Sequence, residues 1–445
     1  MVFWMAWVII PLAIEIFPAL SGFWILLRKK KIKENKSMPI KFPEITLIIP
    51  VYNSSDTLKE CLESIYDSTY PKELIDIILV NNMSQDDSFK VFTDCQKQFE
   101  ALSMCWINAK QGKSKALNMA LFSSKGKYIL HIDSDGKLEK HAVEHMVTRF
   151  EQHPEIHCMT GSILTDFEKI EATPQLGLRY ARRCEFFEYA QAFLAGRNYE
   201  SEKGRVYTLS GAFSAFRKST ILKTNLYNSM TVCEDTHISF QVRGLLKKNI
   251  YLCEKALFFV DPIDNWGKLY TQRQRWQRGE LEVAHMFFKD KLLGFKGICQ
   301  NFAVRLLLYD HTFAFPRMIW YFALLFLVFK NYSMGLVLGS LGLIYLLYCL
   351  SGFLFYLNVL SYMKDYKEIR RYYQSKSYIL LLMPFFNFLT FWIRLAGIIN
   401  CITTRGTWKT ATLGEEWANL TQIVHHDFKG IIGVINKIRE WVNNE

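Results

Sequence analysis

The sequence predicts an α/β domain with a parallel, doubly wound sheet, inserted between apolar segments long enough to span a membrane. Two observations predict this arrangement. From Pro43 onward, short β-branched runs alternate with helical repeats, which is the pattern of parallel sheets covered by helices. Both ends of the chain hold long apolar runs bordered by basic residues, whereas the middle has the composition of an ordinary globular domain.

The composition limits the class of protein. The chain has 445 residues, of which 50% are hydrophobic and 15% aromatic, so it is long enough for more than one domain. A formal net charge of +12 fits nucleic acid, an anionic membrane face or an anionic substrate. Because the clearest basic clusters flank apolar runs, we expect the chain to associate with a lipid bilayer and not with nucleic acid. The 10 cysteines show no Cys-x-x-Cys spacing, which argues against a zinc site and indicates reduced thiols in a cytosolic domain.

The N-terminal segment predicts a retained anchor. Residues 4–27 are almost wholly apolar and reach the length of a spanning helix. They lack the basic start and the small-residue cleavage site of a signal peptide, so we expect residues 1–30 to stay in the membrane. Basic residues follow at 28–36, and basic flanks stay cytoplasmic. The following domain is therefore predicted to lie in the cytoplasm.

Strands and helices alternate through the next part of the chain. We predict strands at residues 45–49, 75–80, 105–107 and 128–132, and helices at 55–68, 88–99 and 113–121. Each strand ends in a polar loop, and these loops meet at one edge of a parallel sheet, where ligands bind. The absence of Gly-x-Gly-x-x-Gly and of a Walker-type loop argues against a dinucleotide site and a P-loop nucleotide site. Further on we expect a strand at 159–164, a helix at 179–195, a turn and strand at 208–217, and a helix at 234–246.

Three short patterns suggest chemistry. Asp133 and Asp135 follow a buried strand and precede Gly136, so they could hold a hard divalent cation, although a solvated turn gives the same pattern. Glu234 and Asp235 begin a helix, where acids are also favoured by the helix dipole. A third pattern places an amide, a guanidinium and an indole on one helical face, which suits a phosphate and a sugar ring but is also compatible with a solvated basic helix. Its residues are Gln272, Arg275 and Trp276.

The C-terminal third predicts a return to the membrane. Residues 280–312 mix apolar and basic side chains like helices on a membrane surface. Apolar stretches at 313–329, 334–363 and 378–402 predict two or three spans within residues 313–404, and basic residues at 364–376 mark a cytoplasmic loop. The last stretch contains Pro384 and Arg394, so both a full crossing and an interfacial position stay open. Residues 405–445 form an amphipathic tail, and residues 43–279 the α/β domain.

Several motifs in a fixed order resemble the membrane-embedded family 2 glycosyltransferases, the cellulose, chitin, hyaluronan and poly-N-acetylglucosamine synthases. The resemblance covers roughly residues 43–290 and the membrane layout. Its motifs are Ile48-Ile-Pro-Val-Tyr-Asn53, Val80-Asn-Asn-Met-Ser84, Gly112-Lys-Ser-Lys-Ala-Leu-Asn118, Asp133-Ser-Asp135, Ser210-Gly-Ala-Phe213, Glu234-Asp235 and Gln272-x-x-Arg275-Trp276. This resemblance implies a GT-A fold, a UDP-sugar donor, Mg²⁺ or Mn²⁺ as cofactor, and a single displacement that inverts the anomeric centre.

The resemblance also implies roles for individual residues. Donor-binding residues are Pro50, Tyr52, Asn82, Lys113, Asp133, Gln272 and Arg275, with Tyr52 and the Asn82 loop at the uracil and Gln272 and Arg275 at the diphosphate. Asp135, with Asp133, is implied to bind the metal. Asp235 matches the general base, and Trp276 and Glu234 belong to the acceptor site, with Trp276 as the floor under the acceptor sugar.

Two departures from the family pattern stand out. Asn81-Asn82 replaces an acidic pair that is frequent after the second strand, which weakens the prediction of base selectivity. Asn53-Ser54-Ser55 replaces the common Asn-Glu-Glu, a smaller change. The tail shows no cyclic-dinucleotide-binding domain.

We therefore expect a multi-pass plasma-membrane enzyme with its catalytic domain in the cytoplasm. The first hypothesis is a processive synthase that extends a saccharide and exports it through its own helices, together with export or modification partner proteins. The second is a distributive transferase that adds one sugar to a lipid-linked acceptor. A third, a nucleotide-binding receptor or transporter without enzymatic activity, would need neither Asp235 nor the Asp133–Asp135 pair.

Overall fold

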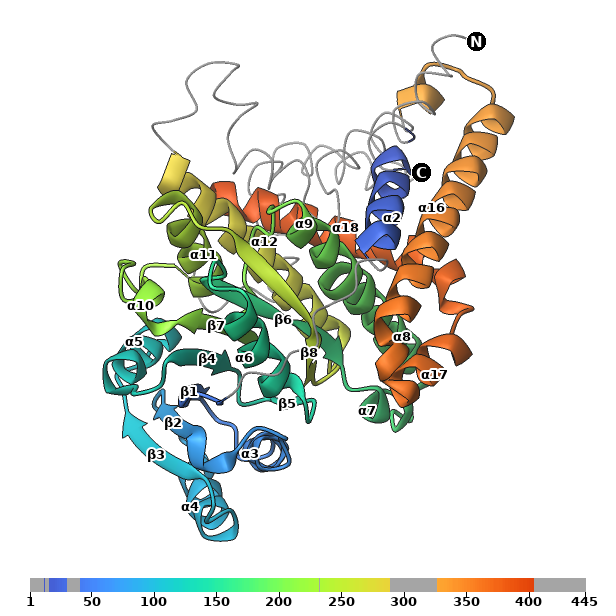
Figure 1. The fold of residues 1–445 in the computed structure, drawn as a ribbon. Coiled ribbons are helices and arrows are strands. Elements are labelled where there is room, and N and C mark those ends of the chain that lie inside the picture. Colours follow the sequence, from blue (N-terminus) through green and yellow to red (C-terminus); the bar gives the residue numbers. More distant parts are fainter. Residues whose placement is uncertain (1–11, 13–15, 30–40, 232, 289–325, 404–445) are drawn as a thin grey trace, which may run out of the picture.

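A mixed sheet with helices on both faces forms the centre of the protein (Figure 1). The computed structural model describes residues 12, 16–29, 41–231, 233–288 and 326–403. The sheet has 8 strands in the order β3-β2-β1-β4-β7-β6-β8-β5. Along the chain these are β1 (Ile45–Val51), β2 (Ile75–Asn81), β3 (Ser103–Asn108), β4 (Tyr128–Ile132), β5 (Gly136–Leu138), β6 (Cys158–Thr165), β7 (Phe213–Arg217) and β8 (Ile250–Val260).

Half of this sheet matches the predicted topology and half corrects it. Strands β3, β2, β1 and β4 are parallel, as expected from the alternation of strands and helices. However, β7 is antiparallel to both β4 and β6, and β5 is antiparallel to β8, so the prediction of a wholly parallel sheet is wrong. Because β7 starts beside the end of β4, Phe213 pairs with Ile132 and the glycine-containing turn before β7 lies next to Asp133.

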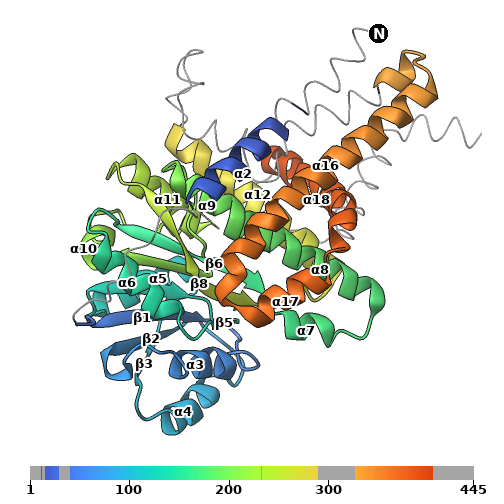
Figure 2. The ribbon, with the colours of Figure 1, turned by 45° about the vertical axis from the view of Figure 1, so that its right-hand side comes forward.

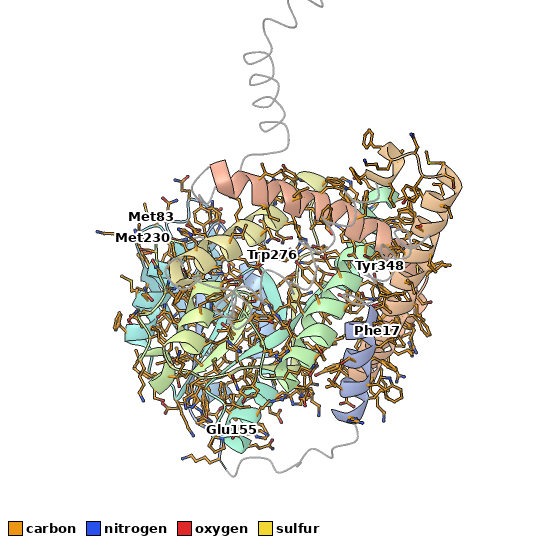
Figure 3. All side chains as sticks on the ribbon, turned by 90° about the horizontal axis from the view of Figure 1, so that it is seen from above. Phe17, Met83, Glu155, Met230, Trp276 and Tyr348 are labelled. Carbon is orange, nitrogen blue, oxygen red and sulfur yellow. The ribbon has the colours of Figure 1, made fainter. Side chains whose placement is uncertain are left out.

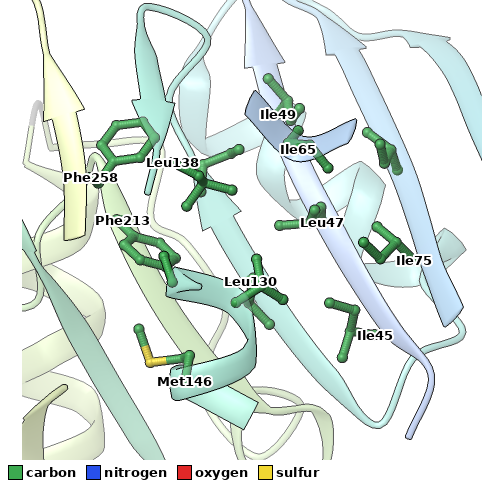
Figure 4. Packing of buried hydrophobic residues seen from close by; sticks show 14 of the residues in the cluster. Ile45, Leu47, Ile49, Ile65, Ile75, Leu130, Leu138, Met146, Phe213 and Phe258 are labelled. Carbon is green, nitrogen blue, oxygen red and sulfur yellow. The ribbon is translucent and has the colours of Figure 1, made fainter. Parts of the chain in front are cut away.

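Alternating side chains of β1 fill two separate cores. Ile45, Leu47 and Ile49 pack with α3 (Leu58–Tyr66), α4 (Ser88–Gln98) and α6 (Ala142–Gln152), as the close view in Figure 4 shows in part. Ile48 points to the opposite face and packs with α5 (Lys113–Ser123), α10 (Lys218–Ile221) and α11 (Glu234–Gly244). Since both faces are covered, β1 is buried along its whole length, which explains its continuous apolar sequence.

From residue 167 onward, the chain adds a helical layer beside the sheet. Its first helices are α7 (Phe167–Glu171), α8 (Leu176–Tyr189), the π-helical segment η3 (Ala190–Gly196) and α9 (Arg197–Glu202). They are followed by α12 (Trp266–Phe288), α16 (Met334–Tyr362), η4 (Met363–Asp365), α17 (Lys367–Ser375) and α18 (Ile379–Thr403). Residues of α8, α12, α16, α17 and α18 share one apolar cluster that includes Phe187 and Tyr373. Helix α12 runs unbroken through residue 279, so the domain border predicted there falls inside a helix.

Two described stretches are long and apolar enough to cross a membrane, Met334–Asp365 and Ile379–Ile399. The first extends away from the sheet domain and exposes side chains such as Leu338, Leu346 and Phe353, while half of the second is buried (Figure 2). Helix α2 (Phe17–Lys29) packs beside α16. The predicted surface helices beyond residue 288, the apolar stretch 313–325, the basic residues 30–36 and the tail 405–445 lie outside the described residues.

Candidate active site

The site lies where the sheet changes direction. β1 pairs with β2 on one side and with β4 on the other, so the order in which the strands are added reverses between β1 and β4. Such switch points form the ligand crevices of open α/β sheets. The loops after the two strands are joined by a hydrogen bond of 2.8 Å between the hydroxyl groups of Ser54 and Ser134. A cavity of about 1140 Å³ opens here, large enough for a ligand of several rings.

The structure brings every predicted site residue to the wall of this one cavity. Pro50, Tyr52, Asn82, Lys113, Asp133, Asp135, Glu234, Asp235, Gln272, Arg275 and Trp276 all line it. They come from six separate segments of the chain. Figure 3, which views the molecule of Figure 1 from above, shows Trp276 near the centre, with Met83 and Met230 on one side and Phe17 and Tyr348 on the other.

Lys113 joins two of the predicted carboxylates. Its Nζ lies 2.6 Å from Oδ1 of Asp133 and 3.2 Å from Oε1 of Glu234. Burial opposes a charge on Lys113, but the two carboxylates outweigh burial and raise its pKa, so it stays protonated. His131 lies 3.9 Å from Asp133, but burial and the charge of Lys113 lower its pKa to about 3, so it is neutral at physiological pH. Glu234 thus lines the cavity and also forms an ion pair with Lys113.

Asp135 has the surroundings of a cation ligand. Its side chain faces the open cavity, but protein encloses it on the other sides. This burial is the main cause that raises the pKa of Asp135 to about 6, and the charge of Asp133 is the second. Within the described residues no group of three or more His, Cys, Asp or Glu side chains forms a closed metal site. Two carboxylates still fit Mg²⁺ or Mn²⁺, because Mg²⁺ is commonly held by one or two carboxylates, with waters and substrate phosphates completing the shell.

Asp235 is oriented by one contact within its own helix and one from outside it. Its Oδ2 accepts a hydrogen bond of 3.0 Å from the backbone N–H of Gly211, in the turn before β7, and its Oδ1 accepts one of 2.7 Å from the N–H of Thr236. The N-cap position of α11 is Cys233, whose side chain makes no capping hydrogen bond. Burial is the main cause that raises the pKa of Asp235 to about 6, and the charge of Glu234 is the second. The charge of Lys113 lowers this pKa.

The two asparagines after β2 have different partners. Asn81 accepts from the N–H of Ser84 at 2.8 Å and donates to Asn108 at 3.0 Å, so it stabilises the turn. Oδ1 of Asn82 accepts from the N–H of Gly112 at 2.6 Å. Because a backbone N–H can only donate, this contact assigns the amide oxygen and leaves the Asn82 NH₂ group as the donor available to a ligand.

Helix α12 presents Gln272, Arg275 and Trp276 to the cavity, as their spacing predicts. The alternative of a solvated basic helix is wrong, because Arg273 is 0% exposed and Arg278 only 6%. Oε1 of Gln272 is buried and has no hydrogen-bond partner among the described residues, so a ligand hydroxyl could donate to it.

Some cavity residues were not predicted. Tyr189 is the last residue of α8 and Phe193 lies within the π-helical segment, and their ring centroids are 6.3 and 6.2 Å from that of Trp276. Arg197 of α9 and Arg394 of α18 also line the cavity. Two signals for these residues were present in the sequence: the aromatic residues of the helix predicted at 179–195, and Arg394 within an apolar stretch. Only the fold shows that they face the same cavity.

Parts of this chain are similar to known proteins. Residues 46–222 match the model of a family described as Glycosyl transferase family 2. A poly-beta-1,6-N-acetyl-D-glucosamine synthase of Staphylococcus epidermidis is 24% identical over 280 residues, which cover 61% of this chain and 64% of that protein, so the chain spans less than two thirds of that relative. The probable glycosyltransferase YdaM of Bacillus subtilis is 25% identical over 365 residues, covering 79% of this chain and 81% of that protein.

Among solved structures, the mannosyltransferase PcManGT from Pyrobaculum calidifontis, in complex with GDP-Man and Mn²⁺, superposes with a TM-score of 0.58 at 15% identity. The superposition covers 90% of this chain and 99% of that chain. Residues 46–222 thus resemble the glycosyl transferase family 2 model, and the chain shares a GT-A type α/β fold with PcManGT.

Proposed function

We propose that this chain is an inverting glycosyltransferase that moves a sugar from a UDP-sugar to the end of a growing saccharide, as a processive polysaccharide synthase at a membrane. The observation that carries the proposal is that the Asp133–Asp135 pair, Asp235 and Trp276 face a single cavity. Similarity to poly-beta-1,6-N-acetyl-D-glucosamine synthases favours a polysaccharide product. The Mn²⁺ and nucleotide-sugar complex of PcManGT supports a metal-dependent reaction with a nucleoside-diphosphate sugar.

The donor would bind across the switch point. Tyr52 and the NH₂ group of Asn82 would contact the base, and Lys113 and Asp133 the ribose side of the nucleotide. Asp135, with Asp133, would hold Mg²⁺ or Mn²⁺, which when bound stabilises negative charge on the leaving diphosphate. Gln272 and Arg275 would contact the same diphosphate, where the guanidinium supplies a fixed positive charge in a partly desolvated place.

The acceptor would stack on Trp276 with one hydroxyl directed at Asp235. In the transfer step the acceptor oxygen forms a bond to the anomeric carbon, the bond from that carbon to the UDP oxygen breaks, and the hydroxyl proton passes to Asp235. A pKa of about 6 leaves Asp235 ionised at neutral pH and still basic enough to take that proton. One displacement inverts the anomeric centre, so no protein nucleophile is required.

The apolar helices beside the cavity would give the product a route. Helix α18 packs along α12 and contributes Arg394 to the cavity, so an acceptor beyond Trp276 would meet a helix that is apolar enough to span a bilayer. A distributive transferase that adds one sugar to a lipid-linked acceptor would use the same chemistry and differ in the length of its product.

The proposal is tested with the purified full chain, a panel of UDP- and GDP-sugars, and Mn²⁺ or Mg²⁺, with nucleotide release and product size as readouts. We expect release of UDP from one UDP-sugar, a polymeric product and complete loss of activity in excess EDTA. Single-sugar products on lipid would assign the distributive function, and full turnover in EDTA or no turnover with any donor would contradict the proposal.

A further inference from the structure

Arg273 lies behind the indole ring of Trp276 and does not line the cavity itself. Its side chain is 0% exposed, in the contact between α12 and α8. The guanidinium carbon is 4.4 Å from the centroid of the Trp276 ring and 5.5 Å from that of Tyr189. One flat cation therefore contacts both aromatic rings from the protein side.

Two carboxylates of α8 hold this guanidinium in place. Nη2 of Arg273 is 2.5 Å from Oε2 of Glu188 and 4.0 Å from Oε1 of Glu185. Glu185 is itself fixed, because its Oε2 accepts a hydrogen bond of 3.0 Å from the N–H of Ile263. Neither Glu188 nor Glu185 lines the cavity, so among the described residues their side chains contact the site through Arg273 and the rings it touches.

We propose that Arg273 is a positioning residue that sets the tilt of the Trp276 indole for the acceptor sugar. The inference rests on the proposed role of Trp276 as the acceptor platform. A sugar ring stacks on an aromatic face only over a narrow range of tilts, and a cation–π contact is strongest when it is desolvated, as here. With the guanidinium on its inner side, the indole offers its remaining surface to the cavity.

A purely structural role for Arg273 predicts something different. If the residue only neutralises Glu188, any buried cation would serve, and Arg273→Lys would behave like the native chain. If the flat guanidinium orients the indole, Lys would keep the charge but lose the planar contact. Arg273→Lys thus separates the two roles.

The experiment compares Arg273→Lys, Trp276→Ala and the double variant of the full chain, measuring acceptor KM, kcat, UDP affinity and the thermal midpoint. We expect Arg273→Lys to raise acceptor KM by about five- to thirty-fold with UDP affinity unchanged, and the double variant to be no worse than Trp276→Ala alone. Arg278→Lys makes the same change at a buried arginine of α12 outside the cavity and should leave acceptor KM unchanged. If Arg273→Lys does not fold, Glu188→Gln loosens the same guanidinium and should raise acceptor KM in the same way.

An unchanged acceptor KM in the folded variant, or fully additive effects in the double variant, would overturn the positioning role. If Trp276→Ala itself leaves acceptor KM unchanged, the acceptor platform of the proposed function fails instead, so the two failures are distinguishable.

Discussion

At the scale of single residues, the orientation of Asp235 depends on a residue far away in the sequence. The N–H of Gly211 donates to its Oδ2, and a Cβ placed on Gly211 would lie 3.0 Å from that oxygen. The side chain of the proposed base thus lies against a turn where an added methyl group would press on its carboxylate.

Replacing Gly211 by alanine should therefore move the Asp235 carboxylate. We expect Gly211→Ala to lower kcat by about 10- to 100-fold, because small displacements of a catalytic group have effects of this size, while UDP affinity stays near native. The control is Gly177→Ala in α8, where a Cβ meets nothing within 4 Å. Equal activity of the two variants would contradict this role for Gly211.

The raised pKa values of Asp235 and Asp135 predict the pH dependence. Both carboxylates have a pKa of about 6 and act in their ionised forms, so activity is present above pH 6 and is lost as the pH falls through it. At limiting metal, log kcat/KM should fall with a slope approaching two; saturating Mn²⁺ favours ionised Asp135 and should reduce the slope to one. A rate that is flat down to pH 5 would exclude both assignments.

At the scale of elements, the sequence predicts those parts whose pattern is local. The strand at 45–49 and the helices at 88–99 and 113–121 are confirmed within a few residues, because a β-branched apolar run sets the strand and helical apolar spacing sets the helices. The antiparallel β7 and the strand β8 were beyond such reasoning, since pairing partners lie far apart in the chain. The helix predicted at 179–195 exists but widens into a π-helix from Ala190, a change that packing against other helices decides.

The close crossing of helices α12 and α18 is another feature that the sequence pattern does not predict and that the packed structure shows. A Cβ on Gly397 would lie 3.3 Å from Cα of Gln274, whereas one on Gly339 of α16 meets nothing within 4 Å. We expect Gly397→Leu to destabilise the folded chain by about 1–3 kcal/mol through overpacking and to lower turnover by shifting α12. Thermal midpoints in detergent test this, with Gly339→Leu as the matched control. Equal midpoints for the two variants would refute the close crossing.

At the scale of the whole molecule, the chain between the two candidate spans is attached to the sheet domain. The carboxylate of Glu171 in α7 bonds to Arg183 of α8 and accepts a hydrogen bond of 3.0 Å from the Tyr372 hydroxyl of α17. The Tyr366 hydroxyl donates to the backbone oxygen of Lys255 in β8 at 2.6 Å. The basic stretch 364–376 thus contacts the sheet domain, so we expect both to lie on the same side of the membrane.

This attachment predicts the topology of the chain in cells. A single cysteine at the exposed Arg371, in a variant without native cysteines, should resist a membrane-impermeant thiol reagent in intact cells and react after permeabilisation. A cysteine within residues 28–36 should behave in the same way. Labelling of either one in intact cells would reverse the predicted orientation.

The central claim, that this cavity catalyses sugar transfer with Asp235 as the base, is tested most directly by Asp235→Asn. The amide keeps the size of the side chain but cannot accept the acceptor proton. Donor affinity and UDP release are measured in parallel, with Asp261→Asn as a control that removes another cavity carboxylate, one paired with Lys169 at 2.8 Å. We predict near-native UDP affinity and turnover reduced by about 10²- to 10⁴-fold in Asp235→Asn, against near-native turnover in the control. Near-native turnover in Asp235→Asn would contradict the account.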